Sequence, residues 1–375
     1  MPLEFEVLAT DGKARRGRLT TPHGVIETPA FMPVGTLGAV KGLSVDDLEQ
    51  AGSQIMLSNL YHLTLRPGID VIESLGGIHG FTSWDRPILT DSGGYQVFSL
   101  AQRRKLDRQG VTFRSHVDGD KVRFTPETVV ESQCRLGVDI AMMLDDCPPW
   151  PIDEKKAAQS LELTLHWAER ARSAWPDDQA GGLFGIVQGS GFPELRRRAV
   201  DAMTPLDFQG YAIGGVSVGE GPELRRGVVE WIGHLLPEDR PRYLMGLGTP
   251  EDIQHGVSHG VDLFDCVMPA RHARHGQLFT AEGVIKIKNA RYKDDPTPLD
   301  AESTWPLAQR YSRAFLHHLF RTKEITAHVL ATVVNVRFYL DFMRQLRERV
   351  ESGTLTATGD LRAAPAPPST ALPET

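Results

Sequence analysis

The chain has 375 residues and a formal net charge of -7, so it is long enough for one large α/β barrel or two ordinary domains, and its total charge does not indicate a nucleic-acid partner. No run of about 18 apolar residues occurs, which excludes a membrane-spanning helix. The three cysteines are far apart in the sequence and do not indicate a disulfide framework or a cysteine metal site, and the first residues carry no secretory pattern, so we expect a cytoplasmic protein.

Eight short apolar runs alternate with segments of helical periodicity. Continuous apolar runs of this length are typical of parallel strands that are buried on both faces. The runs cover residues 29–36, 55–60, 87–93, 139–146, 183–189, 210–215, 242–248 and 263–269. The helical segments between them cover residues 44–51, 69–75, 125–136, 153–175, 193–203, 222–236 and 249–261. This alternation predicts an α/β protein with a (β/α)8 TIM barrel, in preference to an open doubly wound sheet.

Three segments depart from the barrel repeat. Residues 111–124 alternate with a period of two around Asp118 and Gly119, which predicts a β-hairpin insertion with its turn on that pair. Residues 307–350 have helical character, and we assign residues 290–350 to a C-terminal helical subdomain of one catalytic domain that covers residues 1–350. Residues 353–375 are rich in Ala, Pro and Thr and bury too little apolar surface to fold, which predicts a disordered tail.

The predicted strand ends carry a set of residues suited to chemistry at a sugar carbon. In this fold the active site lies at the C-terminal ends of the strands, and the residues there are Asp91, Ser92, Asp145, Asp146, Gln188, Gly214, Gly215, Met245 and Asp265. Two carboxylates that face one glycosidic carbon can act as nucleophile and proton carrier. We assign Asp265 as the nucleophile and Asp91 as the general acid/base. A single aspartate at a strand end usually caps the next helix, so it is the pair that favours catalysis.

The other strand-end residues suit a flat heterocyclic base. The Asp145 carboxylate can accept from the N–H groups of a guanine-like edge, and the Gln188 amide can donate to a carbonyl oxygen of the base. We predict that Tyr95 and Met245 stack on the two faces of the ring, although a methionine taken alone is more often a core residue.

A basic segment directly follows Asp265. Its cations are Arg271, Arg274, Lys286, Lys288, Arg291 and Lys293. A run of this kind is often only a solvated face, but its position beside a candidate site favours binding of the phosphates of a nucleic acid.

Five motifs, at residues 90–96, 185–189, 211–215, 243–250 and 264–271, resemble those of the bacterial tRNA-guanine transglycosylases, also called queuine tRNA-ribosyltransferases. The similarity covers about residues 3–350. The resemblance implies a (β/α)8 enzyme that exchanges guanine at the wobble position of tRNAs with GUN anticodons, those for Asp, Asn, His and Tyr, for 7-aminomethyl-7-deazaguanine. It also implies a covalent aspartyl-tRNA intermediate, a role in queuosine biosynthesis and a homodimer.

The resemblance also implies roles for single residues. Asp265 matches the family nucleophile and Asp91 its general acid/base. The base-binding set that we predict is Ser92, Tyr95, Asp145, Cys147, Gln188, Gly214, Gly215 and Met245. Cys147 and Val218 resemble the bacterial choices, which favour the small aminomethyl base over queuine. The tRNA-binding set that we predict is Arg271, Arg274, Lys286 and Lys288.

The chain departs from the family at its structural zinc site. The family binds zinc with three cysteines and a histidine, and the matching positions here are Ser303, Trp305, Ala308 and Val334. None of them supplies a normal zinc ligand, so we predict no metal and no other cofactor. We expect packing by Trp305, Pro306, Leu307 and Val334 to offset the loss.

Two other functions stay open at this point. A retaining glycoside hydrolase also uses two carboxylates on a barrel, but that function does not explain the basic segment. A tRNA-binding paralogue without catalysis would be consistent with the missing zinc ligands. Such a protein would be expected to have lost Asp91 or Asp265, and this chain retains both.

Overall fold

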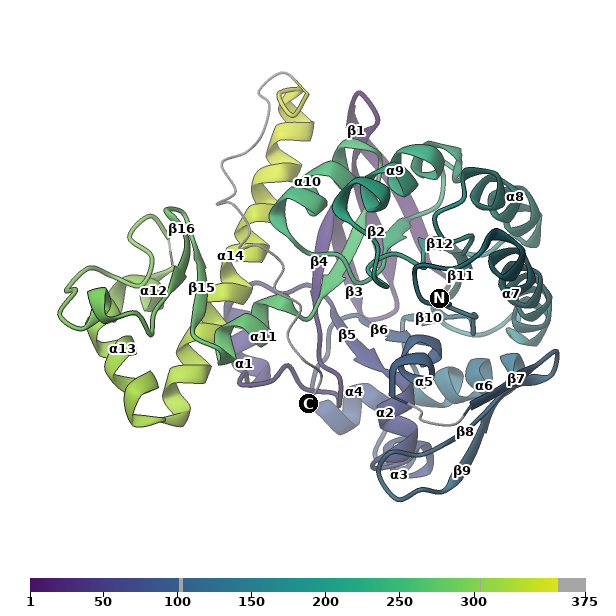
Figure 1. The fold of residues 1–375 in the computed structure, drawn as a ribbon, viewed down its shortest axis with the longest axis horizontal. Helices are drawn as coiled ribbons and strands as arrows, with labels where there is room; N and C mark the ends of the chain where they lie inside the picture. Colours follow the sequence, from purple (N-terminus) through teal and green to yellow (C-terminus); the bar gives the residue numbers. More distant parts are fainter. Residues whose placement is uncertain (101–103, 304, 357–375) are drawn as a thin grey trace.

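The computed structural model describes residues 1–100, 104–303 and 305–356, and its centre is a parallel β-barrel (Figure 1). The barrel strands are β4 (Ala30–Pro33), β5 (Met56–Asn59), β6 (Ile88–Asp91), β10 (Ile140–Met142), β11 (Gly182–Val187), β12 (Gly210–Ile213), β13 (Arg242–Leu244) and β14 (Leu263–Cys266). They pair in the order β4-β14-β13-β12-β11-β10-β6-β5. A bridge between Val34 and Leu57 joins β4 to β5 and closes the barrel. The eight predicted strands and the predicted TIM-like barrel are therefore confirmed.

Helices connect the strands and cover the outside of the barrel (Figure 1). The predicted ones are α1 (Val45–Gln50), α3 (Ile69–Ser74), α6 (Pro126–Leu136), α7 (Glu154–Ala174), α8 (Pro193–Met203), α9 (Pro222–Ile232) and α10 (Pro250–Ser258). Caps fix where several begin: the Ser44 hydroxyl accepts from the Asp47 N–H, and the Thr249 hydroxyl from the Asp252 N–H, each at 3.1 Å. The sequence does not predict α2 (Leu60–Leu65), α4 (Gly77–Thr82) and α5 (Gly94–Leu100).

Large aromatic side chains fill the barrel and its interface with the helices. Phe31, Phe184 and Phe264 are each almost completely buried, and burying one such side chain contributes roughly 1.5–3 kcal/mol. The fit leaves little free space: a Cβ atom added at Gly210 would lie 2.3 Å from the Phe184 ring. The strand ends are therefore held on a rigid frame.

A three-stranded antiparallel sheet, which the sequence does not predict, covers the N-terminal end of the barrel. It contains β1 (Glu4–Asp11), β2 (Ala14–Thr21) and β3 (Gly24–Thr28). Its contacts reach the residues just before the barrel strands: Arg15 forms an ion pair with Asp262 before β14, and the His23 N–H donates to Asp139 before β10. The sheet thus closes the end opposite the predicted active site.

The predicted hairpin insertion is confirmed, with one more strand than expected. β8 (Gly110–Arg114) pairs antiparallel with β9 (Lys121–Phe124), and Gly119 in the turn between them has a φ of +83°. β7 (Arg104–Asp107) adds a third strand on the other side of β8. Its sequence, Arg-Lys-Leu-Asp, carries no apolar alternation that would predict a strand.

The C-terminal region is largely helical, as expected, and packs around a second hydrophobic core. Its elements are α11 (Met268–Arg274), β15 (Gln277–Thr280), β16 (Gly283–Lys286), α12 (Pro306–Arg310), α13 (Arg313–Thr322) and α14 (Ile325–Ser352). The β15–β16 hairpin lies within the basic segment and is not predicted by the sequence. The helix α14 runs from this subdomain along the barrel (Figure 1).

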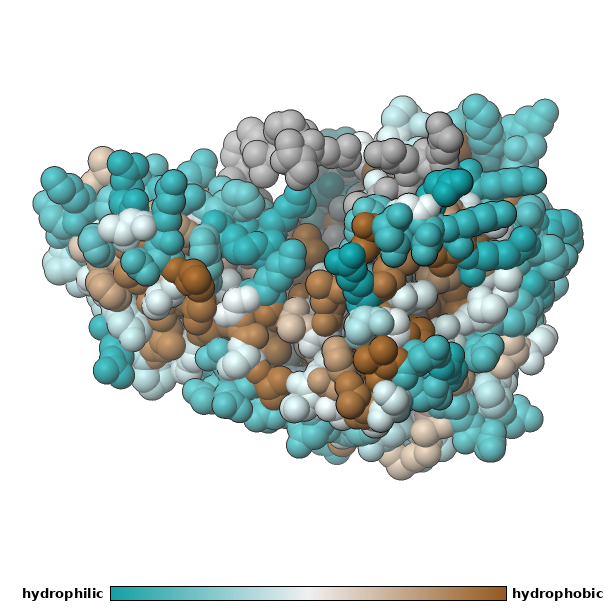
Figure 2. All heavy atoms as spheres, turned by 90° about the horizontal axis from the view of Figure 1, so that it is seen from below, coloured by the Kyte–Doolittle hydropathy of each residue, from teal (hydrophilic) through white to brown (hydrophobic). Residues whose placement is uncertain are grey.

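Hydrophobic side chains gather on one face of the molecule, over the C-terminal subdomain and the middle of the view in Figure 2. At the end of the described chain, Leu355 is buried in the main core, and the Thr356 hydroxyl hydrogen-bonds to Asp11 at 2.6 Å. The rest of the predicted disordered tail, residues 357–375, lies outside the described residues. No helix within the described ranges is both long and apolar enough to cross a membrane.

Candidate active site

The predicted site residues lie at the C-terminal ends of the barrel strands. Asp91 is the last residue of β6, and Asp265 is the third of four residues in β14. Gln188, Gly214 and Met245 each follow directly after a strand, β11, β12 and β13 respectively. The fold therefore brings to one end of the barrel residues that lie far apart in the sequence.

Asp91 is held by neutral donors. Its Oδ1 accepts from the backbone N–H of Leu60 at 3.2 Å and of Gly93 at 3.1 Å, and its Oδ2 accepts from the Asn59 amide. Burial raises the pKa of Asp91 to about 7, and the charge of Asp265 contributes to the increase. A carboxyl group with this pKa can both donate and accept a proton near neutral pH.

Asp265 is oriented by two donors on the same oxygen. Its Oδ1 accepts from the Tyr243 hydroxyl at 2.6 Å and from the Gly246 N–H at 2.7 Å. Burial raises the pKa of Asp265, and the two hydrogen bonds oppose that increase. Burial and the adjacent carboxylate raise the pKa of Tyr243 well above its usual value, so its hydroxyl remains a donor.

Asp145 and Gln188 form a buried pair between neighbouring strands. The Gln188 Nε2 donates to Asp145 Oδ2 at 2.7 Å, and burial raises the pKa of Asp145 to about 6. The Gln188 Oε1 is buried and has no hydrogen-bond partner among the described residues. Gly215 has a φ of +63°, and a Cβ atom there would lie 2.2 Å from that oxygen. Only glycine allows this close approach without strain, and the amide keeps an open hydrogen-bonding position.

The other predicted base-binding residues surround this pair. The Ser92 hydroxyl accepts from the Gly94 N–H at 3.3 Å and contributes a hydrogen bond to Asp145. Tyr95 is 47% exposed on α5, and Met245 is half-buried beyond β13, so a ring held between them stays a prediction. Burial raises the pKa of the Cys147 thiol, which suits a wall residue and not a nucleophile.

Two site residues, Asn59 and Tyr243, are missing from our sequence-based set. Asn59 is the last residue of β5, so the strand-end rule could have identified it. Tyr243 lies in the middle of β13 and is almost completely buried, and its sequence position alone predicts core packing. Its hydrogen bond to Asp265 becomes visible only once β13 and β14 are paired.

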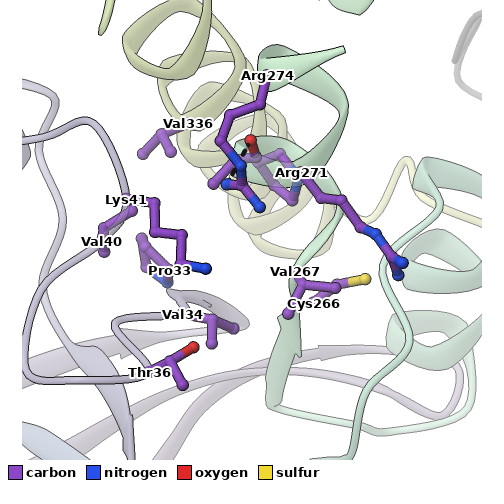
Figure 3. A pocket seen from close by; sticks show the side chains of 12 residues that line it. Pro33, Val34, Thr36, Val40, Lys41, Cys266, Val267, Arg271, Arg274 and Val336 are labelled. Carbon is purple, nitrogen blue, oxygen red and sulfur yellow. Dashed lines mark hydrogen bonds between the residues drawn. The ribbon is translucent and has the colours of Figure 1, made fainter. Parts of the chain in front are cut away.

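A cationic pocket of about 200 Å³ lies between the loop after β4, the end of β14 and α11 (Figure 3). Lys41, from the loop after β4, and Arg271 and Arg274, from α11, line it together with apolar side chains. Cys266, the residue after Asp265, is part of the same wall. The structure thus brings two predicted tRNA-binding arginines together with Lys41, which the sequence-based set omits.

Lys286 and Lys288 lie apart from this pocket lining. Lys286 is exposed at the end of β16, and Lys288 lies two residues beyond it with its ammonium group 5.3 Å from the centre of the Phe320 ring. The basic segment is therefore spread over α11 and the β15–β16 hairpin.

The residues at the family's zinc positions do not fit a zinc ion. Ala308 and Val334 are 1% and 3% exposed and belong to the second hydrophobic core. Ser303 has an oxygen, but it accepts from the Trp305 N–H at 3.2 Å. Leu307 packs against the same core, whereas Pro306, which we expected to help, is exposed. Side chains without sulfur, imidazole or carboxylate groups cannot form a zinc site.

Two other groups of described residues place three potential metal ligands within 4.8 Å of one another: His23 with His79 and Asp139, and Glu230 with His255 and His259. The first lies at the N-terminal end of the barrel. There the imidazole rings stack 3.6 Å apart, and a ring nitrogen of His23 and one of His79 lie 3.0 Å and 3.3 Å from oxygens of the buried Asp139 carboxylate.

A TIM-like barrel that brings the half-buried carboxylates of Asp91 and Asp265, the Asp145–Gln188 pair and a cationic pocket to the C-terminal ends of its strands fits an enzyme of the glycosyl-transfer class. A family model described as queuine tRNA-ribosyltransferase matches residues 11–364. The chain belongs to this family.

Individual relatives give the same result. The chain is 51% identical over 354 residues to a queuine tRNA-ribosyltransferase of Marinobacter nauticus, which covers 94% of this chain and 95% of the relative. It is 51% identical over 351 residues to that of Cereibacter sphaeroides, covering 94% and 93%, and 48% identical over 351 residues to that of Francisella tularensis subsp. novicida, covering 94% and 95%.

Proposed function

We propose that this enzyme, a tRNA-guanine transglycosylase, exchanges guanine at the wobble position of GUN-anticodon tRNAs for 7-aminomethyl-7-deazaguanine in queuosine biosynthesis. Family membership supports the enzyme class and the tRNA substrate. The observation that carries the proposal is the pair Asp91 and Asp265: both are half-buried at the C-terminal ends of their strands, desolvation raises the pKa of each, and the charge of Asp265 adds to the increase at Asp91. We place the reaction in the cytoplasm.

The reaction follows from the orientation of the two carboxylates. The hydrogen bonds from Tyr243 and Gly246 end on Oδ1 of Asp265, so Oδ2 is the attacking atom in this proposal. Oδ2 forms a bond to the anomeric carbon of the wobble nucleotide while the bond from that carbon to guanine breaks, and Asp91 gives its proton to the leaving base. In the second half, Asp91 takes the proton from the incoming base, whose ring nitrogen attacks the same carbon and displaces Asp265.

The Asp145–Gln188 pair is the site for the edge of the base. Asp145 accepts from ring and exocyclic N–H groups of a 7-deazaguanine, and Gln188 and the Gly215 backbone supply the hydrogen bonds to its carbonyl side. Tyr95 and Met245 would contact the ring faces. Cys147 and Val218 would limit the pocket to the small aminomethyl substituent.

The pocket of Lys41, Arg271 and Arg274 is the site for the anticodon loop. Three cations beside a catalytic carboxylate can hold the phosphates that flank the reacting nucleotide, while the apolar wall contacts sugar or base. Lys286 and Lys288 would contact tRNA further along the same surface. The accepted tRNAs would be those for Asp, Asn, His and Tyr.

We expect a homodimer that forms through the C-terminal subdomain. Phe315 on α13 is 41% exposed and stacks on Tyr311 at 5.7 Å, and Ile325 at the start of α14 is 79% exposed. These residues belong to the subdomain on the hydrophobic face of Figure 2, and exposed apolar patches of this kind mark protein interfaces. Sedimentation of the native enzyme beside Phe315→Lys would test it, with a shift toward monomer as the expected result.

We propose that apolar packing, and not zinc, holds the C-terminal subdomain. The support is the burial of Ala308 and Val334 in the second core. Elemental analysis of protein purified without added metal should give far less than one zinc per chain. A stoichiometric zinc content that persists in a His79→Gln, His255→Gln double variant, which alters both of the other candidate clusters, would contradict this proposal.

The decisive experiment measures release of labelled guanine from a GUN-anticodon tRNA on addition of 7-aminomethyl-7-deazaguanine. We expect exchange and a tRNA–protein adduct on denaturing gels for the native enzyme, and neither for Asp265→Ala. A tRNA with a different wobble base is the substrate control. Binding of tRNA without exchange by the native protein would favour the non-catalytic paralogue.

A further inference from the structure

The side chain of Arg196 is buried directly beneath the proposed base site. It lies on α8 with 0% exposure. Its Nε donates to the Ser190 carbonyl at 2.8 Å, and its Nη1 donates to the carbonyls of Val187 at 2.9 Å and Gly214 at 2.7 Å. Its Nη2 donates to the Gly215 carbonyl at 3.1 Å. One guanidinium group therefore holds four backbone carbonyls around the C-terminal ends of β11 and β12.

Arg196 is a buried cation without an ion pair to any described residue, which is unusual for a residue that only stabilises the fold. None of the ion pairs between described residues includes Arg196, although Glu220 lies near enough for its charge to act on it. Burial lowers the pKa of Arg196 to about 10, so the group keeps its charge at neutral pH. A buried charge that contacts carbonyl dipoles and no carboxylate directly is costly compared with a neutral core residue. Its presence calls for a role beyond packing.

The hydrogen bonds of Arg196 determine how the base-binding groups point. In a trans peptide the C=O and N–H groups point in opposite directions. Because the Gly214 carbonyl points at Arg196, the Gly215 N–H points away from it, free of that side chain. The Val187 carbonyl is held in the same way, and the next residue is Gln188, whose amide pairs with Asp145.

We propose that Arg196 is a positioning residue that aligns the Gly215 N–H and the Gln188 amide as one recognition edge for the purine-like base. This inference rests on the proposed function, because the base site is defined there. The fixed fork of an arginine can reach several carbonyls at once, which a lysine cannot. The charge also polarises those peptides and strengthens the adjoining N–H groups as donors.

The chain offers a matched control in Arg242, at the opposite end of the barrel. Arg242 is 4% exposed, and burial lowers its pKa to about 10 as well. Its side chain also donates to backbone carbonyls, those of Leu236 at 2.5 Å and Gly260 at 3.4 Å. A change at Arg242 therefore removes a comparable buried arginine without touching the base site.

The test compares Arg196→Gln, Arg196→Lys and Arg242→Gln in the full-length enzyme. The measurements are calorimetric binding of 7-aminomethyl-7-deazaguanine, the KM values for base and for tRNA, and the melting temperature. We expect both Arg196 variants to weaken base binding and raise the KM for base at least about tenfold, the size of one lost hydrogen bond to a buried group. The KM for tRNA should stay within about twofold. Arg242→Gln should lower the melting temperature and leave base binding unchanged.

The outcomes separate this inference from the proposed function. If the native enzyme exchanges base and the Arg196 variants bind base as tightly as it does, Arg196 is only structural and the inference is wrong. If Arg242→Gln weakens base binding as much as Arg196→Gln, the effect is general destabilisation and the inference is also wrong. If the native enzyme neither binds nor exchanges the base, the proposed function fails and the inference fails with it. Should Arg196→Gln not fold, Arg196→Lys, which keeps the charge, supplies the comparison.

Discussion

The aspartates at the two ends of the barrel differ in their hydrogen-bond partners and in their pKa shifts. At the N-terminal end Asp139 is 0% exposed and contacts His23 and His79, and Asp262 forms an ion pair with Arg15. Burial still leaves the pKa of Asp262 raised beside its arginine, so Asp139 is the clearer example. Burial would raise the pKa of Asp139, but hydrogen bonds from His79 and the backbone and the nearby histidine charges lower it overall.

At the C-terminal end, the hydrogen bonds to Asp91, Asp145 and Asp265 come from uncharged donors. Asp91 is bound by an asparagine amide and backbone N–H groups, Asp145 by Gln188, and Asp265 by Tyr243 and a backbone N–H. The pKa of each is raised. Neutral donors orient a carboxylate without fixing its charge, whereas cationic partners keep it ionised. The carboxylates at the C-terminal end can therefore change protonation state near neutral pH, whereas Asp139 at the N-terminal end stays ionised.

Among the substitutions that test this comparison, we expect the largest effect at Asp91. Asp91→Asn keeps the shape of the side chain but removes the proton carrier, so exchange should fall by about 10²–10⁴-fold. Single-turnover exchange measures the loss. A variant that retains more than a tenth of the native rate would show that Asp91 is not the acid/base.

The matched change at the other end is Asp139→Asn. Removing one partner of a buried ion pair costs about 3–5 kcal/mol, so the free energy of unfolding should fall by roughly that amount. Exchange by the folded protein should stay within about twofold, because Asp139 does not lie at the catalytic end. Urea denaturation and exchange kinetics on the same samples check both expectations, and a large loss of rate without loss of stability would contradict them.

The dependence of stability on pH should have opposite signs for Asp91 and Asp139. Asp91 has a raised pKa in the folded state, so its contribution is complete below about pH 4 and is lost as the pH rises through about 7. Asp139 has a lowered pKa, so its contribution is present above about pH 4 and is lost as the pH falls below that value. Each group changes the slope by at most about 1.4 kcal/mol per pH unit. The free energy of unfolding is measured from pH 3 to 9. Its decrease toward high pH should be smaller in Asp91→Asn, and its decrease toward low pH should be smaller in Asp139→Asn.

The smallest expected effect is at His23, whose side chain is 37% exposed. His23→Gln weakens a partly solvated ion pair and should cost only about 0.5–1 kcal/mol. A chelator should leave the melting temperature of the native enzyme unchanged. A much larger cost that a chelator reproduces would mean that the His23 cluster binds a metal ion.

The comparison also explains what can be predicted from the sequence. The barrel follows from its apolar runs, because strands buried on both faces have a local signature. Asp91 and Asp265 follow from their place at the ends of those runs, together with the family resemblance. The N-terminal sheet does not follow, because partners such as Arg15 and Asp262 are 247 positions apart and neither has a local signal.

Arg196 illustrates the same limit at the level of one side chain. It lies in a run of three arginines, residues 196–198, which in the sequence looks like a solvated face. Arg197 and Arg198 do form exposed ion pairs, with Glu194 and Glu162. Only the packing of α8 on the strand ends makes the first of the three a buried group.

The second hydrophobic core has a consequence for the conditions under which the protein can work. A subdomain held by thiolates and a metal ion loses its structure when the metal is scarce or when peroxide oxidises the sulfur. Ala308 and Val334 offer an oxidant or a competing chelator nothing to react with. Held by apolar packing, as proposed above, the C-terminal subdomain of this enzyme would keep its shape under metal starvation or oxidative stress.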